Sequence, residues 1–466
     1  MDFARVPLAA MAVATALPMV CATAAHAKDC GGAVACECGD RVVASVVLPQ
    51  NLNNCSGDGL VVAAGVVDCQ GHQIAGPGDR TDTVGVLIRG FNASGAQGAA
   101  VRNCRVRNFG RGIEIDGGSG NTVANNVVFS NEIGIWLGDA TANNVVEDNH
   151  VRDNRDEGIH VGSGAHGNQV RRNTLVNNKT ENLYVIGAHG NSLTDNVIDD
   201  SDTAAVLLKD SDDNELLRND IRDRAVLVRG DSNGNVFGDN VLGAGYYHFQ
   251  AFKGDNGWGY PHDNHVVGGS IIKASTCFEL NGAYANTFTG VLVDSCRIRE
   301  EKELGGLVPH DNVFDVTRTD LGEPEYHGQR RAGSIRRIGN PSRLDRLRLD
   351  VRGIDLPSDL PNGVSIGCTL TDFQGQVFSF TVPTGILRVD NRGVNFVDGT
   401  GTFGGVQRLR FARSGPNRWR LKLAARVDLS KADHPLMTLA CQVGASSFSF
   451  TDFWIEHRRG WNLRAS

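Results

Sequence analysis

The sequence predicts an all-β chain in which a parallel β-solenoid of about ten coils is followed by a C-terminal antiparallel β-sandwich. Three observations lead to this prediction. The frame N-x-V-x-x-N-x-V recurs at intervals of roughly 23 residues through the middle of the chain. The 466 residues include 57 glycines, which indicates many turns. The C-terminal part lacks this repeat and carries alternating apolar residues, the pattern of strands with one buried face.

Residues 1–27 are expected to be a signal peptide. Arg5 precedes an apolar run from Leu8 to Cys21, and the tripeptide A-H-A at 25–27 matches a cleavage site. The mature protein is therefore expected to be secreted, periplasmic or at the cell surface. It keeps ten of the 11 cysteines, an even number that favours disulfides in an oxidising compartment. No apolar run is long enough to predict a transmembrane segment.

Residues 28–65 are predicted to form a disulfide-rich cap over the open end of the solenoid. Four cysteines lie between Cys30 and Cys55, and an uncovered sheet edge would invite pairing with another chain. Cys36-Glu37-Cys38 has no His pair or second CxxC at zinc spacing nearby, so disulfides are favoured over a metal.

Residues 66–317 carry the repeat. Each copy holds two or three strands of only a few residues, which bury their apolar sides only when coils stack on one another. The second asparagines of the regular copies are expected to form a ladder of side-chain amides: Asn126, Asn149, Asn173, Asn196, Asn219 and Asn240. Cys69 with Cys104, and Cys277 with Cys296, lie at separations that favour bridges between coils.

With this repeat the chain resembles the right-handed parallel β-helix proteins of the pectate-lyase-like superfamily, over roughly residues 40–320. The resemblance implies a right-handed parallel β-helix. It does not imply one reaction, because that superfamily includes lyases, hydrolases, epimerases, phage tailspikes and noncatalytic proteins.

The C-terminal part begins after a predicted linker at 318–345, which is rich in Arg, Gly and Pro. Residues 346–466 contain about eight alternating strands, which predict an antiparallel β-sandwich. Cys368 and Cys441 are expected to pin its two sheets together.

The two parts differ in charge. Residues 340–466 contain 17 Lys and Arg against 11 Asp and Glu, a balance of +6, and the remaining 29 and 42 leave −13 for the rest. Arg418, Arg420 and Lys422 share the solvent side of one strand. These residues predict attachment of the C-terminal domain to an anionic surface or glycan. The acidic remainder lacks the basic stripe of a nucleic-acid binder.

Function in a packed β-helix is expected on the outward positions of one sheet. One predicted column is aromatic and suits sugar rings: Trp136, His160 and Tyr184, at steps of about 4.8 Å. A second is basic: Lys209, Arg229 and Lys253. Aromatic columns also stabilise neighbouring strands whatever the function, and a basic column is equally typical of a solvated face.

The coil between Asn235 and Asn264 is long and rich in aromatic and histidine residues. Within it, Tyr260-Pro261-His262-Asp263 resembles part of the D-P-H-D/E motif of alginate C5-epimerases, with Tyr260 in place of the first Asp. A second copy at 309–312 falls in the same phase of the repeat, and both copies also fit simple turns before a strand.

These residues favour a secreted protein that acts on a polysaccharide, preferably one containing uronic acid, by lyase- or epimerase-type proton abstraction. The cation that neutralises the carboxylate would be Arg229, a lysine or calcium. The candidate bases are Lys253, His248 and His262, and the candidate acids are Tyr246 and Tyr260.

Three other possibilities stay open at this stage. A hydrolase would use two carboxylates, for which Asp231 and Asp255 are candidates. A noncatalytic carbohydrate-binding or structural protein of the cell surface or matrix fits equally well. Calcium could bind turn carboxylates such as Asp199, Asp200 and Asp202. A soft copper site is not expected, because the mature chain keeps one methionine, Met437, and no His/Cys cluster.

Overall fold

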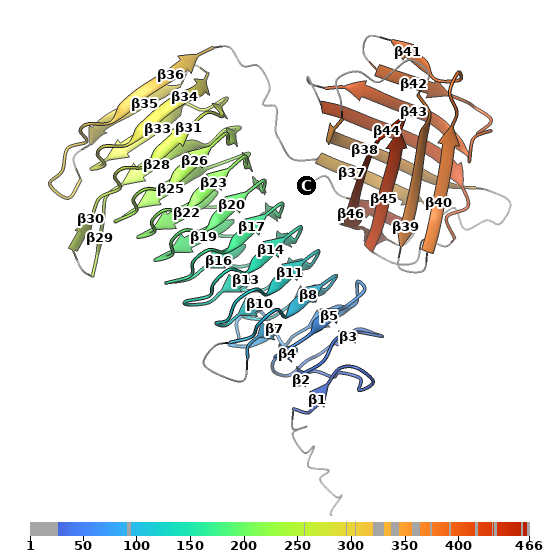
Figure 1. The fold of residues 1–466 in the computed structure, drawn as a ribbon, viewed down its shortest axis with the longest axis horizontal. Coiled ribbons are helices and arrows are strands. Elements are labelled where there is room, and N and C mark those ends of the chain that lie inside the picture. Colours follow the sequence, from blue (N-terminus) through green and yellow to red (C-terminus); the bar gives the residue numbers. More distant parts are fainter. Residues whose placement is uncertain are drawn as a thin grey trace, which may run out of the picture.

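The computed structural model describes residues 27–90, 95–255, 257–294, 296–302, 304–319, 330–336, 344–356, 364–372, 375–390, 393–414, 418–430, 432, 436–457 and 460–463. All secondary structure in these ranges is β-strand, as predicted (Figure 1). The expected signal peptide lies outside the described residues apart from its last position. Within the described part, no helix is long and apolar enough to cross a lipid bilayer.

One face of the right-handed β-helix is a thirteen-stranded parallel sheet, in which each coil adds one strand (Figure 1). Ten of its strands lie within residues 66–317, which agrees with the predicted number of coils, and the other three lie in the predicted cap region. Its strands, in order, are β1 (Asp29–Cys30), β2 (Asp40–Val42), β4 (Leu60–Val62), β7 (Val84–Ile88), β10 (Arg111–Ile115), β13 (Ile133–Leu137), β16 (Ile159–Val161), β19 (Leu183–Ile186), β22 (Val206–Lys209), β25 (Ala225–Arg229), β28 (Tyr246–Gln250), β33 (Thr276–Asn281) and β35 (Arg297–Lys302).

The remaining faces form a 21-stranded sheet with two short strands in most coils. These strands are β3 (Val46–Val47), β5 (Val66–Asp68), β6 (Gln73–Ala75), β8 (Ala100–Arg102), β9 (Arg105–Arg107), β11 (Thr122–Ala124), β12 (Val127–Phe129), β14 (Val145–Glu147), β15 (His150–Arg152), β17 (Gln169–Arg171), β18 (Thr174–Val176), β20 (Ser192–Thr194), β21 (Val197–Asp199), β23 (Glu215–Leu217), β24 (Asp220–Ile221), β26 (Val236–Gly238), β27 (Val241–Leu242), β31 (His265–Val267), β32 (Ser270–Ile271), β34 (Thr287–Val293) and β36 (Val313–Arg318). The apolar residues of all faces point inward and are almost fully buried.

The predicted asparagine ladder is confirmed. Each side-chain amide nitrogen from Asn126 to Asn219 donates to Oδ1 of the next asparagine, at 3.0–3.1 Å. The first asparagines of the repeat form a longer ladder of the same kind, from Asn121 to Asn312. These buried amides also bond to backbone groups at the bends, so the corners of the coil are satisfied without water.

Disulfides close the N-terminal end and join neighbouring coils. Cys30–Cys36 and Cys38–Cys55 lie in the predicted cap region. The cap is not a separate layer, however, since β1, β2 and β4 already belong to the thirteen-stranded sheet. The predicted bridges Cys69–Cys104 and Cys277–Cys296 are both present.

The C-terminal part contains antiparallel sheets of eight and four strands around its own apolar core, which confirms the predicted sandwich. The larger sheet has the order β41 (Arg388–Asp390), β42 (Gly393–Val397), β43 (Val406–Arg413), β44 (Arg418–Val427), β38 (Asp345–Asp355), β37 (Arg330–Arg336), β48 (Gly460–Leu463) and β47 (Ile455–His457). The smaller one has the order β40 (Gly375–Val382), β39 (Ile366–Asp372), β45 (Leu436–Val443) and β46 (Ser446–Phe453).

Two expectations about this part need correction. Residues 330–336, assigned to the linker, form β37 and pair with β38 and β48. The Cys368–Cys441 bridge is present, but it joins directly opposite residues of β39 and β45 in the four-stranded sheet. It therefore does not pin the two sheets together.

Candidate functional site

The outward side chains of the thirteen-stranded sheet form columns, because the parallel strands keep one register from coil to coil. The first column runs through Glu114, Trp136, His160, Tyr184, Leu207, Leu227, His248, Glu279 and Arg299. The second runs through Ile186, Lys209, Arg229, Gln250 and Asn281. Lys253 was predicted in this second column and does not lie there, since Gln250 takes its place beside Arg229.

The aromatic part of the first column stacks as predicted. The ring centroids are 4.8 Å apart for Trp136 and His160, and 4.9 Å apart for His160 and Tyr184. The guanidinium of Arg111 lies 3.9 Å from the Trp136 ring centroid. The His160 side chain is only 12% exposed. The middle of this column is therefore largely covered, and only parts of its rings are accessible to a ligand.

Carboxylates surround these rings. Glu157 lies 3.7 Å from Nδ1 of His160, and burial raises the pKa of Glu181. Burial, together with the charges of Glu181 and Glu157, raises the pKa of Tyr184 to about 12. These middle coils consequently present an acidic environment that disfavours an anionic sugar at this position.

A different group of polar residues gathers three coils further on, on β28 and β33. The Tyr246 and His248 rings stack at 5.9 Å between centroids, both on the outward side of β28. The amide nitrogen of Asn281 lies 2.9 Å from Nε2 of His248 and 3.4 Å from Oε1 of Glu279. With the amide nitrogen of Asn281 as the donor, Nε2 of His248 is the acceptor of this bond. The neutral imidazole is the form that can act as a base.

The electrostatics around Tyr246 set its protonation. Burial raises the pKa of its hydroxyl, the charge of Glu279 raises it further, and Arg299 on the next coil lowers it. Tyr246 therefore stays protonated near neutral pH and can donate a proton. Glu279 and Asn281 were not among the predicted site residues, because their proximity to His248 depends on the register across the long coil.

Cations lie beside this group on the preceding coils. The guanidinium of Arg229 donates to Oε1 of Gln250 at 2.9 and 3.1 Å. Arg229 and Lys209 also flank the ring of Phe252, at 5.2 and 4.8 Å from its centroid. The predicted basic column is thus confirmed for Lys209 and Arg229, and the ring of Phe252 lies against both cations.

The extra residues of the long coil form a hairpin, β29 (Phe252–Gly254) and β30 (Gly257–Gly259), which projects from the edge of the β-helix (Figure 1). Lys253 lies on it, opposite Trp258, and both side chains are exposed. The hydroxyl of Tyr260 donates to the Gly305 carbonyl at 2.6 Å. Tyr260 is therefore engaged in fixing the hairpin base to the next coil.

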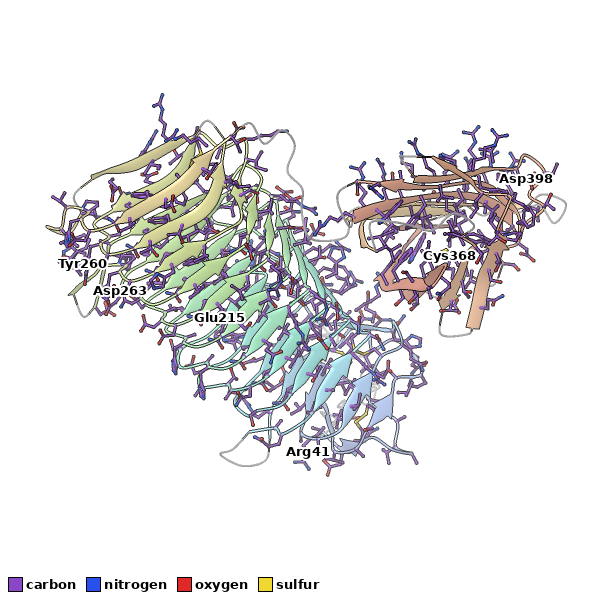
Figure 2. All side chains as sticks on the ribbon, turned by 45° about the horizontal axis from the view of Figure 1, so that its top comes forward. Arg41, Glu215, Tyr260, Asp263, Cys368 and Asp398 are labelled. Atoms are coloured by element: carbon purple, nitrogen blue, oxygen red, sulfur yellow. A yellow bond between two sulfur atoms is a disulfide. The ribbon has the colours of Figure 1, made fainter. Side chains whose placement is uncertain are left out.

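His262 lies at the following corner and is stacked with Tyr284 and then His310 from the next two coils, at 4.7 and 5.2 Å. Its Nδ1 is 2.9 Å from Asp263, and His310 has the same relation to Asp311. Tyr260 and Asp263 lie on the same side of the last coils (Figure 2). The two epimerase-like tetrapeptides thus take one structural position, the turn that leads into the longer asparagine ladder.

Turn carboxylates were the candidates for hydrolysis and for calcium. Oδ1 of Asp210 accepts a bond from the backbone nitrogen of Asp231 at 3.0 Å, so Asp210 caps a turn. Asp255 lies on the exposed hairpin turn. No group of three or more His, Cys, Asp or Glu suited to a metal ion occurs in the described residues.

Fold and site together define the class: the chain is a right-handed parallel β-helix repeat protein. The family model described as "Periplasmic copper-binding protein (NosD)" matches residues 70–273. A comparison with curated proteins finds no match. The residues present do not fit a soft copper site, because all ten cysteines of the described chain are in disulfides and Met437 is buried in the sandwich core.

Solved structures with a similar fold come from carbohydrate-active β-helix proteins. The Dettilon tailspike protein is 12% identical, with 83% of this chain and 86% of that chain covered and a TM-score of 0.39. A variant of the periplasmic alginate epimerase AlgG is 13% identical over 57% and 61%, with a TM-score of 0.32. The A-module of a mannuronan C-5 epimerase from Azotobacter vinelandii is 14% identical over 61% and 83%, with a TM-score of 0.30. At these identities the likeness concerns the fold alone.

Proposed function

We propose that this chain is an exported enzyme that acts on a uronic-acid-containing polysaccharide by removing the proton alpha to the sugar carboxylate. The observation that carries the proposal is the grouping of Tyr246, His248, Glu279 and Asn281 on adjacent strands, with Arg229 one coil away. The five disulfides fit an oxidising compartment outside the cytoplasm.

In the proposed reaction, Nε2 of His248 accepts the proton from C5 of the uronate. The electron pair of the broken C–H bond moves into the carboxylate, which becomes an enediolate with two negative charges. This intermediate needs a cation, and Arg229 is the nearest outward guanidinium on the preceding coil. The incoming sugar would replace the Asn281 amide at His248 and the Gln250 amide at Arg229.

Tyr246 then supplies a proton. If the phenol protonates C5 from the opposite face, the product is the C5 epimer and no bond to the next sugar breaks. If the enediolate electrons instead expel the 4-linked sugar, the phenol protonates the departing oxygen and the product carries a C4–C5 double bond. Because burial raises the pKa of Tyr246, its phenol stays protonated and can donate a proton in the epimerisation and in the lyase reaction.

The test is a panel of pectate, alginate, glycosaminoglycan and bacterial exopolysaccharides, with double bonds followed by ultraviolet absorbance and epimers by NMR. We expect His248→Ala and Tyr246→Phe each to lower the rate by at least about a hundredfold. The matched controls are Lys253→Ala, on the hairpin, and His262→Ala, in the column with Tyr284, and both should keep most activity. Equal losses in the controls would contradict this assignment of the site.

A noncatalytic carbohydrate-binding protein is the second candidate. The stacked Trp136, His160 and Tyr184 rings support it, since aromatic faces pack against sugars without any reaction. Polysaccharide binding with no product from the wild-type chain across the whole panel would favour it. Binding that Trp136→Ala weakens, while His248→Ala leaves it unchanged, would place the ligand on the aromatic column.

A further inference from the structure

The outward face of the eight-stranded sheet in the C-terminal part carries a dense set of cations, which we call the basic basin. Its members lie on four neighbouring strands, β37, β38, β44 and β43: Arg336, Arg346, Arg348, Arg408, Arg410, Lys422 and Arg426. All seven side chains are exposed, and they alternate with buried residues such as Leu347, Leu349, Leu409 and Leu423. The face is therefore built on a rigid, well-packed sheet.

The register places these cations side by side. Arg346 is directly opposite Arg426, and Arg410 is directly opposite Lys422. Arg348 and Arg408 flank Ala424 from its two sides. Like charges in directly opposite positions destabilise a sheet, so this arrangement costs folding free energy unless an anion lies over it.

Intramolecular carboxylates compensate only one side of the basin. Asp350 pairs with Arg420 at 2.6 Å and lies 3.9 Å from Lys422. The guanidinium groups of Arg348, Arg408 and Arg410 form no ion pair with any residue that the structure describes.

The basin is also hollowed. An open hollow of about 740 Å³ lies in this face, where small or uncharged residues such as Ser334, Ala424 and Asn395 accompany four of the seven cations: Arg348, Arg408, Arg410 and Lys422. The outward face of the four-stranded sheet provides a contrast, because its hollow of about 740 Å³ is lined by Thr, Ser and Gln and by no charged residue. Of these two hollows, only the one on the eight-stranded sheet is lined by described cationic residues.

We infer that the basic basin binds a polysaccharide that carries carboxylates on successive sugars. Neighbouring cations are about 4.8 Å apart across strands and about 7 Å apart along one strand, so an extended chain with repeated charges can contact several of them at once. A planar guanidinium matches a carboxylate with two parallel hydrogen bonds. A bilayer surface fits less well, because Val397 is the one large apolar side chain exposed among the described residues that line the hollow.

This surface is separate from the proposed catalytic group and does not depend on catalysis. Binding of the full chain to polygalacturonate is measured at low and at physiological salt, with dextran as the uncharged polymer. We expect binding to polygalacturonate only, weakened by salt because exposed charges are screened over about 10 Å at 0.1 M. The double variant Arg408→Ala/Arg410→Ala should bind about tenfold more weakly and with a shallower salt dependence.

The matched control, Lys179→Ala/Lys273→Ala, removes two exposed positive charges from the β-helix and should leave the affinity unchanged. Wild-type affinity and salt dependence in the basin variant would overturn the proposal. Binding to phosphatidylglycerol vesicles but not to polygalacturonate would overturn it as well, in favour of a membrane surface. His248→Ala should bind polygalacturonate at the basin as tightly as the wild type does. This variant therefore distinguishes a failure of the proposed catalysis from a failure of the proposed binding at the basin.

Discussion

Replacement of one asparagine in the middle of the ladder should destabilise the β-helix strongly. Asn196 is fully buried, and its Oδ1 accepts from both the backbone and side-chain nitrogens of Asn173 at 2.9 and 3.1 Å. Its Nδ2 donates to the Val170 carbonyl at 2.9 Å and to Oδ1 of Asn219 at 3.0 Å. Asn196→Ala leaves two buried donors without a partner, the Asn173 backbone N–H and one Asn173 amide hydrogen, and removes one donor from the Val170 carbonyl.

Each such group costs about 1–3 kcal/mol, and entry of water into the vacated space offsets part of this. The expected loss in the free energy of unfolding is therefore about 2–5 kcal/mol, measured by urea denaturation followed by circular dichroism. Asn196→Asp should be at least as harmful, because a carboxylate would face two oxygens and provide no donor. Thr194→Ala, a half-buried position on β20 in the same coil, is the control and should change stability by less than about 1 kcal/mol. A loss of under about 1 kcal/mol for Asn196→Ala would refute the stabilising role of the ladder.

Three further predictions concern other parts of the β-helix. Burial raises the pKa of Asp223 to about 6, so the folded state holds this proton more tightly than the unfolded state, and the associated stability is lost as pH rises from about 4 to about 6. In thermal denaturation, the melting temperature of Asp223→Asn should therefore rise relative to that of the wild type over this pH range. A difference in melting temperature that does not change with pH would contradict the burial argument. The double variant Cys69→Ser/Cys104→Ser should lower the free energy of unfolding, measured in urea, by about 2–4 kcal/mol. A reductant should then lower the free energy of unfolding less in this double variant than in the wild type. Tyr260→Phe removes the bond to Gly305, so limited trypsin digestion should cut the β29–β30 hairpin faster while overall stability changes by about 1 kcal/mol or less; an unchanged rate would show that the bond does not hold the hairpin.

The sequence was sufficient for the fold because the repeat encodes it redundantly. Each coil repeats the same apolar and asparagine positions, so the Asn126–Asn240 ladder and the stacking of Trp136 on His160 follow from the period alone. The bridge Cys69–Cys104 follows for the same reason, since both residues sit at comparable positions of neighbouring coils.

The predictions that went wrong fall where the period fails. In the long coil, counting by the repeat placed Lys253 beside Arg229, whereas the extra residues form a hairpin and Gln250 continues the column. In the sandwich no period exists, so the sequence could not tell whether Cys368 and Cys441 belong to one sheet or to two. Pairing between distant antiparallel strands depends on packing that a local pattern does not contain.

The same geometry limits which candidate residues can act on one sugar. Outward side chains on neighbouring strands are about 4.8 Å apart, and those two residues apart on one strand are about 7 Å apart. A proton acceptor, a donor and a cation that serve one sugar ring must therefore come from two or three adjacent coils. Tyr246 and His248 on β28, with Arg229 on β25, meet this condition by their register. His262 lies beyond the hairpin, in a separate column with Tyr284. The strand register therefore does not bring His262 next to a sugar ring bound over β28. The sheet geometry thus reduces ten predicted residues to one compact group in which catalysis can be tested.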